Sequence, residues 1–283
     1  MDKEFIQLPE LTLKALFDYS IVAYANRPVV QFVDEEPLTY RRLGQNVEII
    51  QEMLREYGIN PGDRVALYSE NMPNWSAVYF AVTTMGAVIV PILPDFHTSE
   101  AMHIATHAEC KAAFISQKLF ETMLDESQPP SMNLLVILDK LHVLDKLSTP
   151  PKMDKVIKKG GEHLSKAMEK MGKEKKEEQE HVIHEDDLAA IIYTSGTTGS
   201  SKGVMLSHKN ITFDATASQL VVDIYKEDRF LSILPLAHTY ECTVGMVIPV
   251  LNGASIHYIQ KPPTPTILLK ACLLYTSPSP RDS

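Results

Sequence analysis

A short segment rich in hydroxyl groups and glycine follows an apolar run in the second half of the chain. The apolar run, Leu188–Tyr193, predicts a buried strand. Glycines let backbone N–H groups approach an anion closely, hydroxyls add donors, and a lysine supplies positive charge. The pattern therefore predicts a phosphate-binding loop that stabilises charge on a departing pyrophosphate. Its candidate binding residues are Thr194, Ser195, Gly196, Thr197, Thr198, Gly199 and Lys202.

The segment differs from two well-known phosphate-binding motifs. A Walker A loop needs Gly-x-x-x-x-Gly-Lys-Ser/Thr, whereas here Lys202 is followed by Gly203 and separated from Gly199 by two residues. The segment also lacks the dinucleotide-binding pattern Gly-x-Gly-x-x-Gly. A flexible Gly/Ser turn is the alternative interpretation. The buried strand before the segment and the lysine within it favour phosphate binding.

Helical patterns alternate with short apolar runs through the first half of the chain, which is typical of an α/β protein with a parallel sheet covered on both faces. Residues 42–57 show this most clearly, because Leu43, Val47, Ile50 and Leu54 fall on one face of a helix. Gly58 is well placed to end that helix. Further helices are expected over 11–23 and 71–85, and strands over 29–33, 65–68, 87–92, 112–116 and 134–138. Helix-like sequence also follows Ser207.

Composition excludes several classes of protein. The 283 residues include 27 Lys+Arg and 36 Asp+Glu, a formal net charge of −9, which argues against nucleic-acid binding because that needs basic residues to displace counterions. The three cysteines are far apart, so neither a disulfide framework nor a zinc site is expected. Several histidines lack metal-ligand spacing and are expected at the surface. They are His103, His107, His142, His163, His181 and His184.

The chain shows no targeting or membrane-spanning segment. Residues 1–10 contain acidic residues and no apolar core, and the longest apolar runs, 85–93 and 244–251, fall well short of the roughly 20 residues of a bilayer span. We expect a cytoplasmic protein, with peripheral membrane contact and oligomeric state left open. Residues 150–181, rich in Lys and Glu, predict an exposed helix or mobile insertion, with a lipid-surface or partner helix as the alternative.

The segment Tyr193–Gly203 (Tyr-Thr-Ser-Gly-Thr-Thr-Gly-Ser-Ser-Lys-Gly) resembles the AMP-binding signature of the adenylate-forming enzymes, which include acyl-CoA synthetases, adenylation domains and luciferases. Three other blocks resemble that family in the same order, at 38–43, 85–95 and 234–241. The last, Leu-Pro-Leu-Ala-His-Thr-Tyr-Glu, has the form found in long-chain fatty acyl-CoA synthetases. The resemblance covers about residues 10–270.

The resemblance implies an α/β fold, the incomplete large N-terminal domain of an adenylate-forming enzyme, with mostly parallel sheets flanked by helices, over residues 1–270. The implied substrates are a fatty acid, ATP and coenzyme A, with Mg²⁺ as the metal. In the family, the loop Thr194–Gly199 would line the phosphates with Lys202 nearby, and Thr194 would contact Mg²⁺. His238 would lie against the acyl carbonyl of the adenylate. Tyr240 and Glu241 are weaker substrate-site candidates, and Glu241 fits a structural ion pair or cap equally well.

The chain departs from the family pattern in two places. Ser201 precedes the lysine, where many relatives have proline. The later family blocks, including those for ribose and Mg²⁺ and the mobile C-terminal domain, do not appear, so the resemblance implies an N-terminal fragment. Residues 271–283 look like a translated adapter or read-through tail, with a natural disordered tail as the alternative.

Three hypotheses follow. The first is a fragment of an ATP-dependent long-chain fatty-acid–CoA ligase, an acid–thiol ligase that is inactive in this short form. The second keeps adenylation but changes the acid to a medium-chain, aryl or amino acid. The third is a nucleotide-binding module without catalysis.

Overall fold

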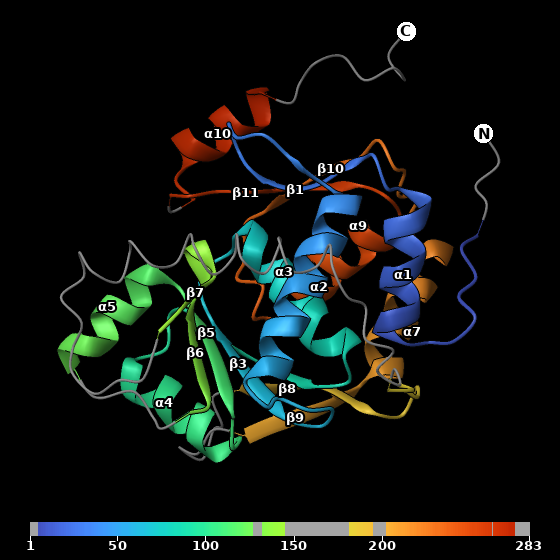
Figure 1. The fold of residues 1–283 in the computed structure, drawn as a ribbon. Helices are drawn as coiled ribbons and strands as arrows, with labels where there is room; N and C mark the ends of the chain where they lie inside the picture. The colour runs from blue at the N-terminus through green and yellow to red at the C-terminus, as the bar shows by residue number, and fades with distance from the viewer. Residues whose placement is uncertain (1–4, 127–131, 145–180, 195–201, 262, 275–283) are drawn as a thin grey trace, which may run out of the picture.

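The larger of two described sheets has seven strands and is mostly parallel (Figure 1). The computed structural model describes residues 5–126, 132–144, 181–194, 202–261 and 263–274. Within them the two edge strands are antiparallel to their neighbours and the five strands between are parallel. In spatial order the strands are β7 (His142–Val143), β6 (Leu134–Ile137), β5 (Ala112–Ile115), β3 (Arg64–Tyr68), β4 (Val88–Ile92), β8 (Leu188–Thr194) and β9 (Lys202–Ser207).

A second sheet joins strands from the two ends of the sequence. Its order is β10 (Arg229–Ser232), β11 (Ser255–Tyr258), β1 (Pro28–Phe32) and β2 (Leu38–Thr39). Val30 is the partner of Ile256 in the parallel β1–β11 pair. The first and last parts of the described chain therefore belong to one folded unit.

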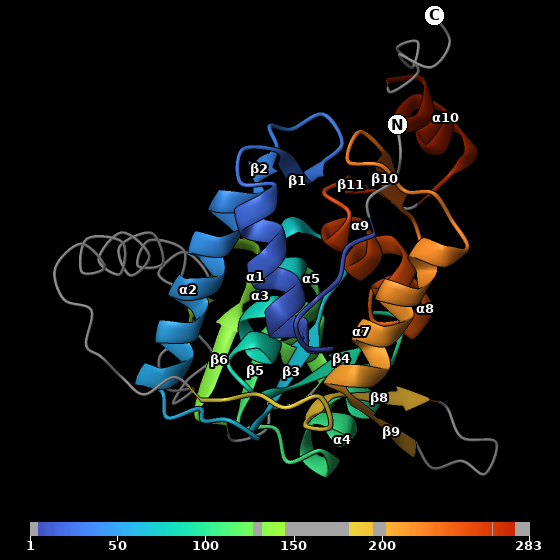
Figure 2. The same ribbon diagram turned by 90° about the vertical axis from the view of Figure 1, so that its right-hand side faces the viewer.

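Helices form one layer between the two sheets and another outside the larger sheet (Figure 2). The inner layer contains α1 (Leu13–Ala23), α2 (Tyr40–Glu56), α3 (Pro73–Thr84) and α9 (Ile248–Leu251). The outer layer contains α4 (Thr98–His107) and α5 (Gln117–Glu126). The remaining described helices are α7 (His208–Ala217), the short turn α8 (Thr239–Glu241), the π-helix η3 (Cys242–Val247), α10 (Pro265–Leu274) and the 3-10 turns η1 (Leu138–Lys140) and η2 (Ser218–Leu220).

Strand alternation divides the core into two parts. In β3, Val65 and Leu67 face the inner helices, whereas Ala66 and Tyr68 face α4 and α5, as the two-residue period of a strand requires. Since both faces of the sheet are covered, its strands are apolar on both sides, which explains the continuous apolar runs in the sequence.

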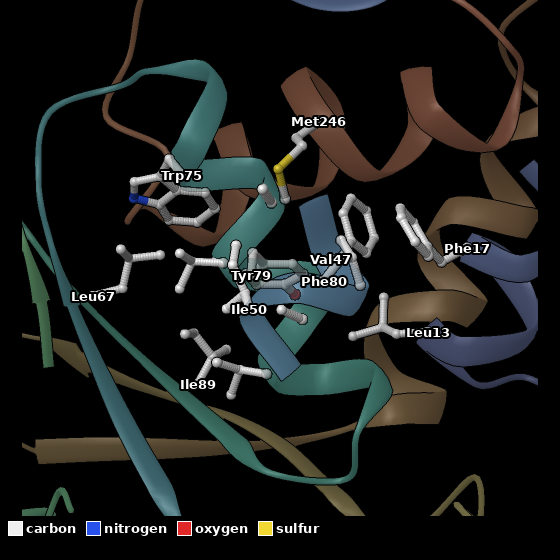
Figure 3. Close-up of a cluster of buried hydrophobic side chains, with 14 of the residues drawn as sticks. Leu13, Phe17, Val47, Ile50, Leu67, Trp75, Tyr79, Phe80, Ile89 and Met246 are labelled. Atoms are coloured by element: carbon white, nitrogen blue, oxygen red, sulfur yellow. The ribbon is translucent and has the colours of Figure 1, made fainter. Parts of the chain in front are cut away.

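Helix α3 is the centre of the inner layer, and ten of its twelve residues are buried. Figure 3 shows Trp75, Tyr79 and Phe80 of this helix surrounded by side chains from other elements. The Phe80 ring stacks on Phe17 of α1 with centroids 4.5 Å apart, and Trp75 stacks on Tyr79 at 5.5 Å. The helix thus carries aromatic rings on several sides rather than on one stripe.

The structure confirms the mixed α/β fold with mostly parallel sheets and helices on their faces. Thr39 caps α2, because its hydroxyl accepts a hydrogen bond from the Arg42 amide, and Gly58 follows the helix with a positive φ of 75°. The expectation for His142 was wrong, because its place in β7 beside β6 leaves it only 9% exposed.

Two expectations concern segments at the limits of the described chain. The charged segment 150–181 lies outside the described residues except for His181, which is exposed. The expected foreign tail begins inside α10, where Ala271 is buried at 1% exposure. Residues 275–283 of that tail are also outside the described part.

Candidate active site

The antiparallel pair of strands β8 and β9, here called the hairpin, flanks the phosphate-loop motif in the sequence. Strand β8 pairs with β4 on one side and with β9 on the other, where Thr194 and Lys202 are direct cross-strand partners. Both residues are exposed, so a hydroxyl and an ammonium group lie at the same end of the two strands. The candidates Ser195, Gly196, Thr197, Thr198 and Gly199 lie outside the described residues. Lys202 is the first residue of a strand, whereas the sequence predicted a loop at this position.

Buried contacts hold the base of the hairpin. The Tyr193 ring is 6% exposed, and its hydroxyl lies 2.6 Å from Nδ1 of His107 on α4. Burial raises the pKa of Tyr193, so the phenol stays protonated. Gly203 is the cross-strand partner of Tyr193, and a Cβ there would lie 2.9 Å from Cγ2 of Ile191 and 3.3 Å from Cζ of Tyr193. The glycine after Lys202 is thus required by packing, which the sequence did not reveal.

The second candidate segment leaves the small sheet at the end of β10. His238 is the N-cap residue of α8 and is exposed, and Tyr240 is 67% exposed. The amide of His238 donates to the carbonyl of Pro235 at 2.9 Å, and its own carbonyl accepts from the Cys242 amide at 2.9 Å. His238 and Tyr240 are therefore both accessible to a ligand, as a substrate-site role requires.

Glu241 differs from these two residues because its side chain is buried, with the residue 8% exposed. Its Oε1 accepts a hydrogen bond from the Ser232 hydroxyl at 2.7 Å. Burial raises the pKa of Glu241, although the hydrogen bonds from Ser232 and from the Ile233 amide oppose that shift. Gly245 leaves room for the carboxylate, since a Cβ there would lie 2.6 Å from Oε1. Of the two interpretations of Glu241, the contacts favour a structural one.

A cleft of about 400 Å³ opens beside this segment. Helix α7, which follows the hairpin and contacts β8, β9 and η3, supplies one wall, and Figure 2 shows it near α8. The cleft is lined by Asp214, Ala217, Ser218, Val221, Thr239, Tyr240, Thr243, Val244 and Ile248. Val244 faces the cleft, whereas Met246, Val247, Val250 and Leu251 are buried in the core. The apolar run 244–251 thus lines the cleft with one end and fills the core with the rest.

The described side chains fit a phosphate group better than a metal bound by protein alone. A hydroxyl at Thr194 and an ammonium at Lys202 can both donate to phosphate oxygens. No cluster of three or more His, Cys, Asp or Glu side chains occurs in the described ranges. A magnesium ion usually takes only one or two protein ligands together with substrate phosphates, so one oxygen from Thr194 is compatible with it.

Comparison with known proteins identifies the family. The model of the family described as AMP-binding enzyme matches residues 17–276. The chain belongs to the AMP-binding enzyme family. The match includes the hairpin and the His238 segment, so both candidate segments lie inside the AMP-binding domain. None of the described helices of the domain is long and apolar enough to cross a bilayer.

Curated relatives of this AMP-binding domain include long-chain acyl-CoA synthetases. The peroxisomal long chain acyl-CoA synthetase 6 of Arabidopsis thaliana is 28% identical over 228 residues, covering 80% of this chain and 31% of the relative. The human long-chain-fatty-acid–CoA ligase 1 is 28% identical over 236 residues, covering 80% and 32%. The chain thus spans about a third of the length of these relatives.

Solved structures show the same fold. The Klebsiella oxytoca NpsA N-terminal subdomain in complex with 3-hydroxybenzoyl-AMSN has a TM-score of 0.69 and 19% identity, covering 97% of this chain and 59% of that one. VinN also has a TM-score of 0.69, at 18% identity, covering 90% and 58%. At this identity the likeness concerns the fold alone.

Proposed function

We propose that this AMP-binding domain is part of an ATP-dependent long-chain fatty-acid–CoA ligase. The observation that carries the proposal is the cross-strand pairing of Thr194 with Lys202, the two residues that flank the hydroxyl-rich segment in the sequence. The relatives named for long-chain acids and the Pro-Leu-Ala-His-Thr-Tyr-Glu form of residues 235–241 support the choice of acid.

The proposed reaction has two steps. A carboxylate oxygen of the fatty acid attacks the α-phosphorus of ATP, and the bond from that phosphorus to the pyrophosphate oxygen breaks. The thiol of coenzyme A then attacks the acyl carbonyl, releasing AMP and losing its proton, to form the thioester. No protein nucleophile takes part, so catalysis depends on positioning and on charge stabilisation.

The described residues have distinct tasks in this proposal. The Lys202 ammonium offsets the charge that grows on the pyrophosphate as it leaves, and the Thr194 hydroxyl binds a phosphate oxygen or Mg²⁺. Bound Mg²⁺ would neutralise part of the phosphate charge. His238 is proposed to lie against the acyl carbonyl, with the acyl chain in the cleft lined by Tyr240 and Val244. Glu241 is proposed to support that segment rather than to touch substrate.

The test is pyrophosphate release by the full-length protein with palmitate, octanoate, benzoate and an amino acid. Palmitate should give the highest kcat/KM. Lys202→Ala should lower kcat/KM for ATP by about 100-fold or more, because a charge-stabilising donor is lost, whereas Lys209→Ala, which removes an exposed lysine paired with Glu185, should change it little. Equal rates for Lys202→Ala and the unchanged protein would refute the phosphate role.

The acyl acceptor has a specific alternative. A relative from Arabidopsis thaliana named long-chain-fatty-acid–[acyl-carrier-protein] ligase AEE15 is 31% identical over 210 residues. Assaying thioester formation with coenzyme A and with holo-acyl-carrier protein distinguishes the two acceptors. Both share the phosphopantetheine thiol, so the chemistry of the second step is the same.

The 283-residue chain by itself is proposed to bind ATP weakly and not to turn over. Steady acyl-CoA production by the purified chain would contradict this. Nucleotide binding by the full-length protein without pyrophosphate release for any acid would instead favour the non-catalytic module.

A further inference from the structure

The side-chain amide of Asn71 bridges two distant parts of the chain. Asn71 lies in the connection between β3 and α3, at the carboxyl end of a central strand of the large sheet. Its Nδ2 donates to Oγ of Ser232 at 2.9 Å and to the carbonyl of Leu234 at 2.7 Å. Its Oδ1 accepts from the amide of Leu236 at 2.8 Å. One side chain thus satisfies both a donor and an acceptor of the backbone that leads to His238.

Ser232 and Glu241 extend this set of contacts. Ser232 is 3% exposed, and its hydroxyl accepts from Asn71 while donating to Oε1 of Glu241 at 2.7 Å. The network therefore contacts the backbone before His238, at Leu234 and Leu236, and the side chain of Glu241 after it. The Ser232–Glu241 bond is buried, and the bonds of Asn71 to Ser232 and Leu236 are partly buried. Such bonds fix a geometry, because breaking one leaves a polar group with little access to water and no partner.

We propose, resting on the function above, that Asn71 is a positioning residue for His238. Asn71 holds residues 232–236 against the carboxyl end of β3, and Ser232 with Glu241 holds the turn that follows. The side chain of His238, which is itself exposed, is then presented at a fixed place beside the cleft. The hairpin that carries Lys202 makes none of these contacts, so the network acts on the acyl side of the site.

Asn74, in the first turn of α3 and three residues after Asn71, provides a matched control. It is also half-buried, and its Nδ2 donates to the carbonyls of Leu138 and Asp139 at 2.8 and 3.3 Å. Asn74→Ala therefore removes an equivalent amide that does not contact the His238 segment. Asn71→Asp keeps an acceptor for the Leu236 amide but loses both donors, and serves as the conservative variant.

The first readout is amide hydrogen exchange in the 283-residue chain, which needs no enzymatic activity. Asn71→Ala should speed exchange of the Leu236 amide about tenfold, since that amide loses its partner, while Asn74→Ala should leave it unchanged. Asn71→Asp should fall between them. Unchanged exchange at Leu236 in Asn71→Ala would overturn the proposal.

The second readout is adenylation by the full-length protein. Asn71→Ala should lower kcat about tenfold and raise the KM for the fatty acid, because a small displacement of an aligned group is costly, with the KM for ATP unchanged. Asn71→Asp should recover part of kcat, and Asn74→Ala should match the unchanged protein. Equal losses in both alanine variants, or a change confined to the KM for ATP, would refute positioning. If the protein without substitutions does not adenylate any acid, the proposed function is refuted. Hydrogen exchange at Leu236 would still show whether Asn71 holds that segment.

If Asn71→Ala does not fold, Ser232→Ala replaces it. That variant removes the acceptor for Asn71 and the donor to Glu241 without touching the Leu236 bond. It should lower kcat in the same direction with the KM for ATP unchanged, and an unaltered kcat would count against the proposal.

Discussion

Nδ1 of His107 lies 2.6 Å from the hydroxyl of Tyr193, two residues that are 86 positions apart in the sequence. The contact ties the last turn of α4 to the strand residue that precedes Thr194. The ring of Tyr193 is buried and lies beside its cross-strand partner Gly203. The base of the hairpin is therefore anchored to the outer helical layer as well as to its own sheet.

Removing the Tyr193 hydroxyl should destabilise the chain. Tyr193→Phe is expected to lower the free energy of unfolding by about 1 kcal/mol, the usual net value of one hydrogen bond. His107→Ala should cost a similar amount, and the double variant should cost no more than either one if the two residues act through each other. Urea unfolding measures all three, with Tyr240→Phe, at an exposed ring, as the control. Additive losses would show that the contact is not a coupled pair.

Alanine should have opposite effects at two glycines. Gly203→Ala is expected to lower the free energy of unfolding by about 1–3 kcal/mol, because its Cβ would overlap Ile191. Gly44 lies inside α2, and a Cβ there would lie 3.3 Å from the flexible end of the Ile21 side chain on α1. Gly44→Ala should therefore raise the free energy of unfolding by up to about 1 kcal/mol, because alanine favours a helix over glycine. Thermal unfolding of both variants checks the signs. A stable Gly203→Ala would mean that the Ile191 and Tyr193 side chains do not lie against Gly203.

Stability should fall as the pH drops below neutral. Burial lowers the pKa of His208 to about 4, and burial together with the charge of Arg229 lowers the pKa of His257 to about 4. In the unfolded chain a histidine has a pKa of about 6.5. Below that pH the unfolded chain binds protons that the folded chain does not, so the free energy of unfolding decreases as the pH falls from about 6.5 to the folded pKa. Each histidine should cost about 2 kcal/mol by pH 5.

His208→Asn tests this assignment. Nδ1 of His208 accepts from the Leu13 amide at 3.2 Å, and the asparagine oxygen offers an acceptor in its place. The variant should have a shallower decline of unfolding free energy between pH 7 and 5. An unchanged slope would assign the pH dependence to other groups.

A bulky residue in the cleft should alter the choice of acid. Val244→Trp would fill part of the space beside Tyr240 and is expected to raise the KM for palmitate about tenfold with less effect on octanoate, because the longer chain needs more of the cleft. The control is Val22→Trp on the surface of α1, where Val22 is 78% exposed. Equal KM changes for both acids would place the acyl chain elsewhere.

Local patterns predicted the large sheet well. Strands β3, β4 and β5 are buried on both faces, and such strands leave an apolar run that is visible without any partner. The amphipathic stripe of α2 was equally clear. These signals depend only on near neighbours in the sequence, and the structure has elements at those places.

The small sheet and the contacts of the site depend on distant residues. The β1–β11 pair joins Val30 to Ile256, and Asn71 contacts residues more than 160 positions away. Local periodicity in the sequence cannot predict either contact. Strand β9 was missed because Gly203 and the exposed Val204 and Met205 lack the burial pattern of a central strand. The motif named Thr194 and Lys202 as candidates, but it did not predict that they are direct cross-strand partners.

Helix α3 packs against residues of both sheets within a single core. Ten of the twelve residues of α3 are buried. Neither sheet can therefore separate from the rest of the protein without exposing apolar side chains of this helix to water. Fluorescence of Trp75, the one tryptophan in the sequence, would then follow the melting of the two layers together, as one cooperative event.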